Sequence, residues 1–181
     1  ILEKMDFNNQ AADYDDRAGL PAGVAEKVAT TISEFASPIQ GKTLLEIGAG
    51  TGEIGIHLQQ LHVNYCGFDL SEKMLKVFKS RKDALKETII QANGNDTWPV
   101  PPNSTDIFFS SRAIHLLNEA HVLAELQRAA SPKGTALIIG RVARAEHSVQ
   151  SQMRQQMRQL LKKFNIEPRD GKKRSTSCLL Y

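Results

Sequence analysis

The sequence is poor in residues that cross-link or anchor a small protein. It has two cysteines, Cys66 and Cys178, one tryptophan and three tyrosines among 181 residues. Two cysteines without a regular spacing exclude a disulfide-dense scaffold and are typical of a reducing compartment. No apolar run approaches the roughly 20 residues of a membrane helix, and residues 1–10 contain no apolar signal core. We therefore expect a cytoplasmic protein that does not enter a membrane.

A strong excess of one charge is also lacking, since the formal net charge is only +3. The charge is nevertheless uneven, because ten basic and three acidic side chains lie between residues 141 and 174. Such a segment is either a solvated helix face or a surface for an acidic partner such as nucleic acid. Aromatic side chains do not alternate with the basic ones there, so a stacking surface is not indicated. We favour the solvated face.

Apolar segments typical of strands alternate along the chain with segments of helical periodicity. The strands are expected at 43–47, 64–68, 87–91, 106–110 and 135–140. Helices are expected from Pro21, Ser71 and Asn118, and a longer one carries an apolar stripe over 149–164. This alternation predicts an α/β fold, a doubly wound, mostly parallel sheet with helices on both faces.

The most informative segment runs from Leu44 to Gly52, where an apolar strand ends in three glycines at alternate positions. Glycine permits positive φ angles and lets a ligand approach the main chain closely. The segment therefore predicts a strand, a tight turn and a helix start that hold a nucleotide-like ligand. The dinucleotide fingerprint would need a glycine where Glu53 stands, and no Gly-Lys-Ser/Thr of a P-loop follows.

The residues Glu46-Ile47-Gly48-Ala49-Gly50-Thr51-Gly52 resemble motif I of the class I S-adenosylmethionine-dependent methyltransferases, whose pattern is E/D-x-G-x-G-x-G. The resemblance implies a Rossmann-like fold with S-adenosylmethionine as the cofactor. It implies that the loop residues Gly48, Ala49, Gly50 and Gly52 contact that cofactor. An acid at Glu46 suits the cationic end of this ligand better than it suits a pyrophosphate.

A second acid, Asp69, ends the second expected strand 21 residues after Gly48. An acid near that spacing can accept both ribose hydroxyls of a nucleoside. Leu70 and Met74 follow it and can pack on an adenine face. After the third strand the family has an acid that binds the adenine amino group. Here that stretch begins Asn93-Gly94, and an asparagine oxygen can accept from an amino group. Asn95 and Asp96 are the alternatives to Asn93.

Further site residues are expected at the end of the fourth strand and near the N-terminus. Ser110 would lie near the methionine part of the cofactor, because ligands bind at the carboxyl ends of the strands. His115 resembles the histidine after strand four of many small-molecule methyltransferases and could act as a general base. Tyr14 and Arg17 lie in a stretch that resembles the F-x-x-x-A-x-x-Y-D leader of one family branch. There a tyrosine closes over the cofactor and an arginine grips its carboxylate.

The other histidines, His57, His62, His121 and His147, show no metal-ligand spacing, so no metal site is expected. The resemblance runs from Phe7 to about Arg141 and is greatest to the small bacterial type-11 group. We expect a cover segment over residues 1–20, a cofactor-binding core over 21–141 and a basic helical segment over 142–181. The family ends in an antiparallel strand hairpin, for which only 176–181 remain, so we expect it to be missing or incomplete.

The function that follows is methyl transfer to a small-molecule acceptor by in-line displacement. Nucleobase amino-group methyltransferases carry Asn/Asp-Pro-Pro-aromatic after strand four, where this chain has Ser110-Ser111-Arg112-Ala113. Two alternatives stay open at this point. One is a nucleic-acid-directed enzyme or binder that uses the basic segment, and the other is a non-catalytic methyltransferase-like module. The acceptor and the oligomeric state cannot be read from the sequence.

Overall fold

A computed structural model describes residues 14–140, except for the side chain of Arg17. The expected basic segment at 142–181, the apolar stripe within it and the expected strand hairpin lie outside the described residues. So do residues 1–13 of the expected cover segment. Within the described part, no helix is long and apolar enough to span a lipid bilayer.

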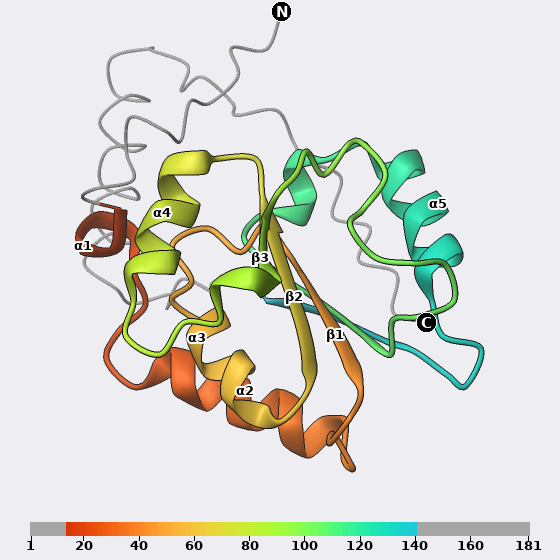
Figure 1. The fold of residues 1–181 in the computed structure, drawn as a ribbon, viewed down its shortest axis with the longest axis horizontal. Helices are drawn as coiled ribbons and strands as arrows, with labels where there is room; N and C mark the ends of the chain where they lie inside the picture. Colours follow the sequence, from red (N-terminus) through yellow and green to blue (C-terminus); the bar gives the residue numbers. More distant parts are fainter. Residues whose placement is uncertain (1–13, 141–181) are drawn as a thin grey trace, which may run out of the picture. The chain divides into compact units, whose positions relative to one another are not determined.

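The described residues form a five-stranded parallel sheet in the order β3-β2-β1-β4-β5 (Figure 1). The elements are α1 (Tyr14–Ala18), α2 (Val24–Phe35), β1 (Thr43–Ile47), α3 (Gly55–Leu58), β2 (Asn64–Asp69), α4 (Glu72–Ser80), β3 (Ile89–Gln91), β4 (Ile107–Ser111), α5 (Glu119–Ala129) and β5 (Ala136–Gly140). The strand order reverses direction between β1 and β4. In such sheets ligands bind beyond the carboxyl ends of the strands at this switch point.

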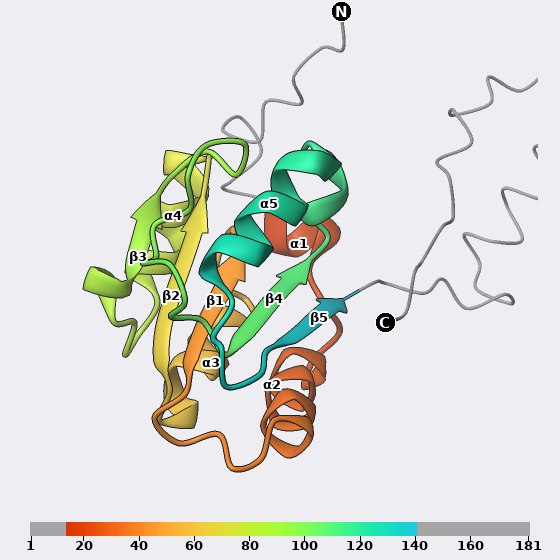
Figure 2. The ribbon, with the colours of Figure 1, turned by 90° about the vertical axis from the view of Figure 1, so that its right-hand side faces the viewer.

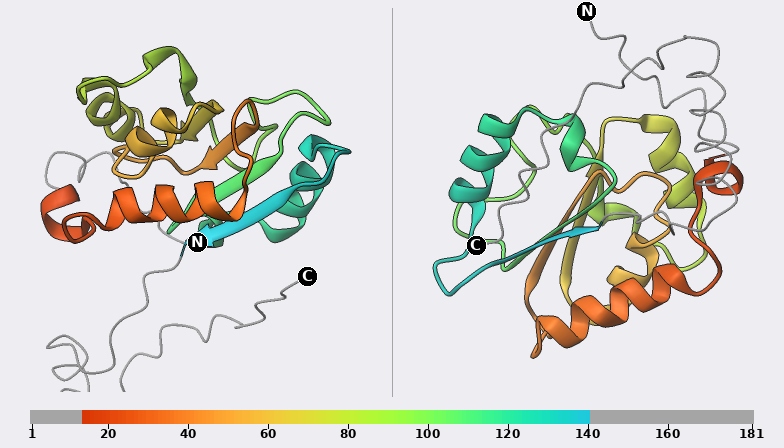
Figure 3. Two further views of the ribbon diagram at one scale, coloured as in Figure 1. Left: turned by 90° about the horizontal axis from the view of Figure 1, so that it is seen from below. Right: turned by 180° about the vertical axis from the view of Figure 1, so that it is seen from behind.

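Each central strand buries both of its faces, which explains why the strands read as continuous apolar runs. On β1, Leu44 packs with Phe109 of β4 and Ile32 of α2 in one core cluster. Leu45 packs with Phe108 of β4 and Val122 of α5 in the other. Helices α2, α3 and α4 therefore contribute to the core on one side of the sheet and α5 on the other (Figures 2 and 3). The predicted doubly wound α/β fold is confirmed.

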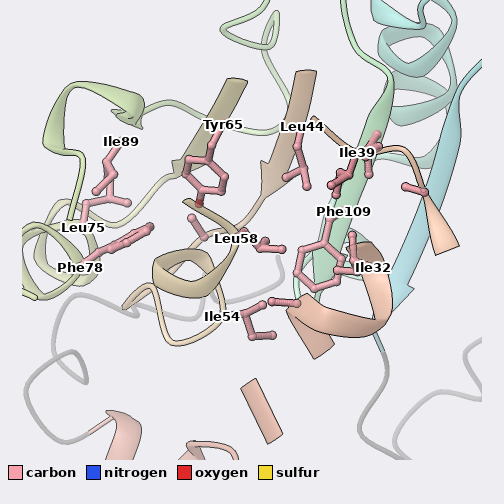
Figure 4. Packing of buried hydrophobic residues seen from close by; sticks show 14 residues of the cluster. Ile32, Ile39, Leu44, Ile54, Leu58, Tyr65, Leu75, Phe78, Ile89 and Phe109 are labelled. Carbon is pink, nitrogen blue, oxygen red and sulfur yellow. The ribbon is translucent and has the colours of Figure 1, made fainter. Parts of the chain in front are cut away.

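The larger core cluster lies on the face of the sheet that α2, α3 and α4 cover. Figure 4 shows Tyr65 and Phe78 on the side of α4, with Phe109 and Ile32 on the side of α2. The rings of Tyr65 and Phe78 meet edge to face, with their centroids 6.4 Å apart. Such a packed layer supplies a rigid base for the loop above it.

Two of the predicted helix starts have the capping geometry that their sequences indicate. The Ser71 side chain accepts a hydrogen bond from the Met74 amide at 3.2 Å, and the Asn118 side chain accepts one from the His121 amide at 3.0 Å. Each cap satisfies one of the donors left free at a helix N-terminus. Ser71 therefore starts α4 directly after β2, and Asn118 starts α5 soon after β4.

Three details differ from the expectations. β3 begins only at Ile89, because Lys86–Thr88 form a 3₁₀ turn. α2 begins at Val24, since Gly23 has a left-handed φ of 77° and cannot be the first helical residue. The helix after the glycine loop, α3, has only four residues before a 3₁₀ turn follows. It therefore offers less of a helix dipole than the sequence suggested.

Candidate cofactor-binding site

The glycine loop leaves β1 in a left-handed conformation that favours glycine at all three positions. Gly48, Gly50 and Gly52 have φ angles of 78°, 56° and 74°. A Cβ on Gly48 would lie 2.1 Å from the Ala113 Cβ, and one on Gly52 would lie 2.1 Å from the Phe78 ring. Among the residues that the structure describes, a Cβ on Gly50 would meet no atom within 4 Å. Gly48 and Gly52 are therefore needed for packing, whereas Gly50 borders open space at the switch point.

The loop is held in place by hydrogen bonds to the end of β2. The amides of Gly48 and Ala49 both donate to the Phe68 carbonyl at 2.9 Å, and the Gly50 amide donates to Asp69 Oδ2 at 3.0 Å. Asp69 Oδ1 accepts from the Ser71 amide at 2.8 Å. Each carboxylate oxygen has a further lone pair. Asp69 can therefore keep the loop in place and still accept hydroxyl groups.

The pKa of Asp69 is raised above its ordinary value because the carboxyl is largely buried, while amide donors from Ser71, Gly50 and Leu70 lower it. Beside it, Leu70 exposes 58% of its surface, whereas Met74 is only 3% exposed. Leu70 can offer an apolar face to a ligand. The expectation that Met74 does the same is not met, because its side chain packs into the core.

Glu46 does not line the open side of the loop. Its side chain is 3% exposed, and its Oε2 accepts a hydrogen bond from the Tyr65 hydroxyl. Burial raises the pKa of the carboxyl to about 8, although the bond from Tyr65 lowers it. A carboxyl that is mainly protonated at pH 7 is a poor partner for an ammonium group. In the structure Glu46 contacts Tyr65, and its expected role toward the cationic end of the cofactor stays a prediction.

Ser110 also supports the end of β1 through its side chain. It is fully buried, its hydroxyl donates to the Ile47 carbonyl at 2.9 Å and accepts from the Ile114 amide at 3.2 Å. Both hydrogen-bonding functions of the hydroxyl are therefore used within the protein. The side chain joins the end of β1 to the 3₁₀ turn at Ile114–Leu116. The expected place of Ser110 near the methionine part of the cofactor stays a prediction.

The stretch expected to recognise adenine follows β3 closely. Asp69 and Gln91 are register partners on β2 and β3, so Asn93 lies two residues beyond the end of that pair. The Asn93 side-chain oxygen accepts from the Asn95 amide at 3.1 Å, while that of Asn95 accepts from the Asn118 amide at 2.8 Å. The Gly94 carbonyl accepts from the Trp98 indole at 3.0 Å. Asn93 remains the predicted adenine contact, with Asn95 and Asp96 as the alternatives.

The remaining predicted residues lie at two places. His115 is exposed on the 3₁₀ turn after β4. Tyr14 lies on α1, where the Arg112 guanidinium carbon is 5.7 Å from its ring centroid. Arg17 is part of α1, but its side chain lies outside the described residues.

Several residues near the loop were not identified from the sequence. They are Thr51, Glu53, Arg81 and Arg112, which connect α1 to the loop by ion pairs and hydrogen bonds. Tyr65, the partner of Glu46, is another. One signal for Glu53 was available, because it stands where a dinucleotide fingerprint has its third glycine. The others depend on contacts between segments that are distant in sequence.

Comparison with known proteins places the chain in a family. Residues 45–138 match the family model described as "Methyltransferase domain". A SAM-dependent methyltransferase from Aquifex aeolicus has the same fold, with a TM-score of 0.62, 19% identity and 88% of each chain covered. The chain belongs to the class I S-adenosylmethionine-dependent methyltransferases. S-adenosylmethionine is the cofactor of that family.

Curated relatives extend beyond this chain. The malonyl-[acyl-carrier protein] O-methyltransferase of Serratia marcescens is 29% identical over 132 residues, which are 72% of this chain and 49% of that protein. The release factor glutamine methyltransferase of Enterococcus faecalis is 32% identical over 139 residues, which are 76% of this chain and 50% of that protein. The chain thus spans half or less of the length of the curated relatives it matches.

Proposed function

We propose that this chain transfers a methyl group from S-adenosylmethionine to a small-molecule acceptor, with Asp69 and the glycine loop as the centre of the cofactor site. The observation that carries the proposal is the open space at Gly50, which adjoins the one acid at the end of β2. A side chain at position 50 would extend into that space. The site suits a nucleoside, because the carboxylate oxygens of Asp69 can accept from vicinal hydroxyls as well as from the backbone amides.

The family's cofactor supplies an activated methyl group on a sulfonium, so the protein has to orient rather than to activate. In our proposal Asp69 holds the ribose, Asn93 accepts from the adenine amino group, and Leu70 covers the adenine face. Gly48, Ala49, Gly50 and Gly52 allow close approach of the backbone. Tyr14 and Arg17 would bind at the methionine end.

His115 is proposed to take up the proton that the acceptor's nucleophilic atom releases as the new bond forms. It is exposed on the turn after β4, at the edge where the acceptor would enter. A general base typically contributes about 10²–10⁴-fold in rate. His115→Gln should therefore lower turnover strongly and leave the affinity for S-adenosylhomocysteine unchanged.

A small acceptor is favoured over a nucleobase by the residues at the end of β4. Enzymes that act on a base stack it between aromatic or apolar side chains. Here Ser110 is buried, and Arg112 is engaged by Glu53. No aromatic residue occurs between positions 110 and 118. The relatives named above differ in what their names say they methylate, so they do not select one acceptor.

The test is calorimetric titration with S-adenosylmethionine and S-adenosylhomocysteine. Asp69→Asn should weaken one-site binding more than tenfold, which corresponds to about 1.4 kcal/mol. Asp106→Asn is the matched control, because Asp106 accepts a bond from the Thr43 amide at the opposite ends of the strands. Absence of binding by the folded wild type would refute the proposal. Methyl transfer to RNA or DNA but to no small molecule would refute the proposed acceptor class.

A further inference from the structure

Arg112 directly follows β4 and has a left-handed backbone, with φ of 63°. A non-glycine residue adopts this conformation at a cost of about 1–2 kcal/mol, so the surroundings have to hold it there. The Arg112 guanidinium donates to the Ala18 carbonyl and to Glu53 Oε2, the latter at 3.2 Å. It also lies over the Tyr14 ring. Ala18 and Tyr14 belong to α1, and Glu53 binds the Leu20 amide just after that helix.

Glu53 connects the glycine loop to the same segment. Its Oε1 accepts from the Leu20 amide at 2.5 Å, while its Oε2 accepts from Arg112. The side chains of Arg112 and Glu53 are 26% and 18% exposed. Water therefore screens this pair less than it screens an ordinary surface ion pair. Gly19 directly follows α1 and packs closely on it, since a Cβ there would lie 2.1 Å from the Asp15 carbonyl oxygen.

A second ion pair holds the first turn of α1. Asp15 accepts from the Thr51 hydroxyl and from Arg81 Nη2, both at 2.5 Å. Arg81 also donates from Nε to the Thr51 carbonyl at 2.7 Å. The attachment points Thr51 and Glu53 lie one and three residues beyond Gly50. α1 is thus tied to the part of the loop that directly follows the open position.

We propose that the Arg112–Glu53 pair is a positioning device. It keeps residues 14–20, the described part of the expected cover segment, on the glycine loop and so slows cofactor release. The inference rests on the proposed function. α1 has only five residues, and an isolated helix of that length is not stable in water. Its place therefore depends on contacts to other segments. Loss of the pair would loosen the hold of Arg112 on the Tyr14 ring and the Ala18 carbonyl, while leaving the sheet and the Gly50–Asp69 contact intact.

The experiment combines two measurements on the full chain. Amide hydrogen exchange reports on residues 14–20 in the absence of ligand, and stopped-flow displacement gives the dissociation rate of S-adenosylhomocysteine. Arg112→Asn removes the guanidinium but tolerates the left-handed backbone. Glu53→Gln keeps an oxygen for the Leu20 amide and removes the charge. Arg112→Lys is the conservative variant. Lys76→Ala is the control, because Lys76 forms an exposed pair with Glu72 on α4.

We expect Arg112→Asn and Glu53→Gln to raise exchange at residues 14–20 and to speed dissociation at least fivefold. Exchange in β1 and β4 should not change, and Arg112→Lys should recover part of the slow release. Wild-type exchange and wild-type dissociation in both variants would overturn the inference and leave the proposed function standing. A folded wild type that does not bind S-adenosylhomocysteine would overturn both, whatever the exchange data show.

Discussion

Asp69 at the end of β2 accepts a hydrogen bond from the Gly50 amide, with 3.0 Å between nitrogen and oxygen. This contact joins the two sequence signals that first indicated a nucleotide site, the glycine loop and the acid after the second strand. The carboxylate that is proposed to hold the ribose therefore also sets the position of the loop. A change in Asp69 should affect both, which makes the glycine positions the cleaner probes of the loop.

The three loop glycines should respond differently to an added methyl group. Gly52→Ala would place a Cβ 2.1 Å from the Phe78 ring at a positive φ. We expect a loss of about 2–4 kcal/mol in the free energy of unfolding, from overpacking and backbone strain together. Urea denaturation measures it.

Gly50→Ala has the same backbone strain without the clash, since no atom of residues 14–140 lies within 4 Å of the added Cβ. We expect a loss of only about 1–2 kcal/mol in stability, together with a clear loss of affinity for S-adenosylhomocysteine. Equal stability of the Gly50 and Gly52 variants would contradict the packing argument. Unchanged affinity of Gly50→Ala would show that the open space is not the ligand site.

Glu46 should make stability depend on pH between about 4.5 and 8. Burial raises its folded-state pKa from 4.5 to about 8. In that range the unfolded chain has lost the proton, while the folded chain retains it. The contribution of Glu46 is therefore fully present below pH 4.5 and is lost as pH rises through 8. Melting temperatures from pH 5 to 9 should fall less steeply for Glu46→Gln than for the wild type. Parallel curves would contradict the raised pKa.

Arg128 is expected to stabilise the segment that runs from Asn93 to Val100. It donates to both oxygens of Glu125 and to the carbonyls of Val100 and Trp98. Glu125, only 6% exposed, accepts from the Trp98 amide. Arg128→Ala leaves that carboxylate without its cation and should lower the free energy of unfolding by about 2–4 kcal/mol.

Fluorescence of Trp98, the single tryptophan of the chain, follows this unfolding directly. Lys76→Ala, which breaks the exposed pair with Glu72, should change stability by at most about 0.5 kcal/mol. An effect of Arg128→Ala no larger than that of this control would contradict the role of Arg128.

Two buried hydroxyls should give effects of opposite sign. Ser110 uses its hydroxyl twice, so Ser110→Ala leaves the Ile47 carbonyl and the Ile114 amide without this partner. We expect it to cost about 1–3 kcal/mol of stability. Within the described residues, Thr105 Oγ1 is buried without a hydrogen-bond partner. Thr105→Val replaces it with a methyl group of similar size and should leave stability equal or raise it by about 1 kcal/mol. Denaturation curves of the two variants give the change in the free energy of unfolding for each. Loss of stability in Thr105→Val would contradict the absence of a partner for Thr105 Oγ1.

Local signals predicted the elements of the fold well, because each depends on neighbouring residues. The strand at 43–47 has the predicted bounds, and the caps at Ser71 and Asn118 form the predicted bonds. The strand predicted at 87–91 is too long, because Lys86–Thr88 form a 3₁₀ turn that periodicity does not reveal. Trp98, in a stretch of turn residues, belongs to the core through its contacts with Phe68 and Phe108.

The sequence by itself determined the fold class, the family and the place of the loop, because strand patterning and the spacing of Gly48, Gly50, Gly52 and Asp69 are local properties of the chain. The tertiary structure decided which of the polar side chains face the open edge. It buried Glu46 against Tyr65 and Ser110 against Ile47, and it brought Arg81 and Arg112 to α1. The direction in which a side chain points at the end of a strand depends on segments packed against it from elsewhere in the chain. A pattern along one segment cannot contain that information.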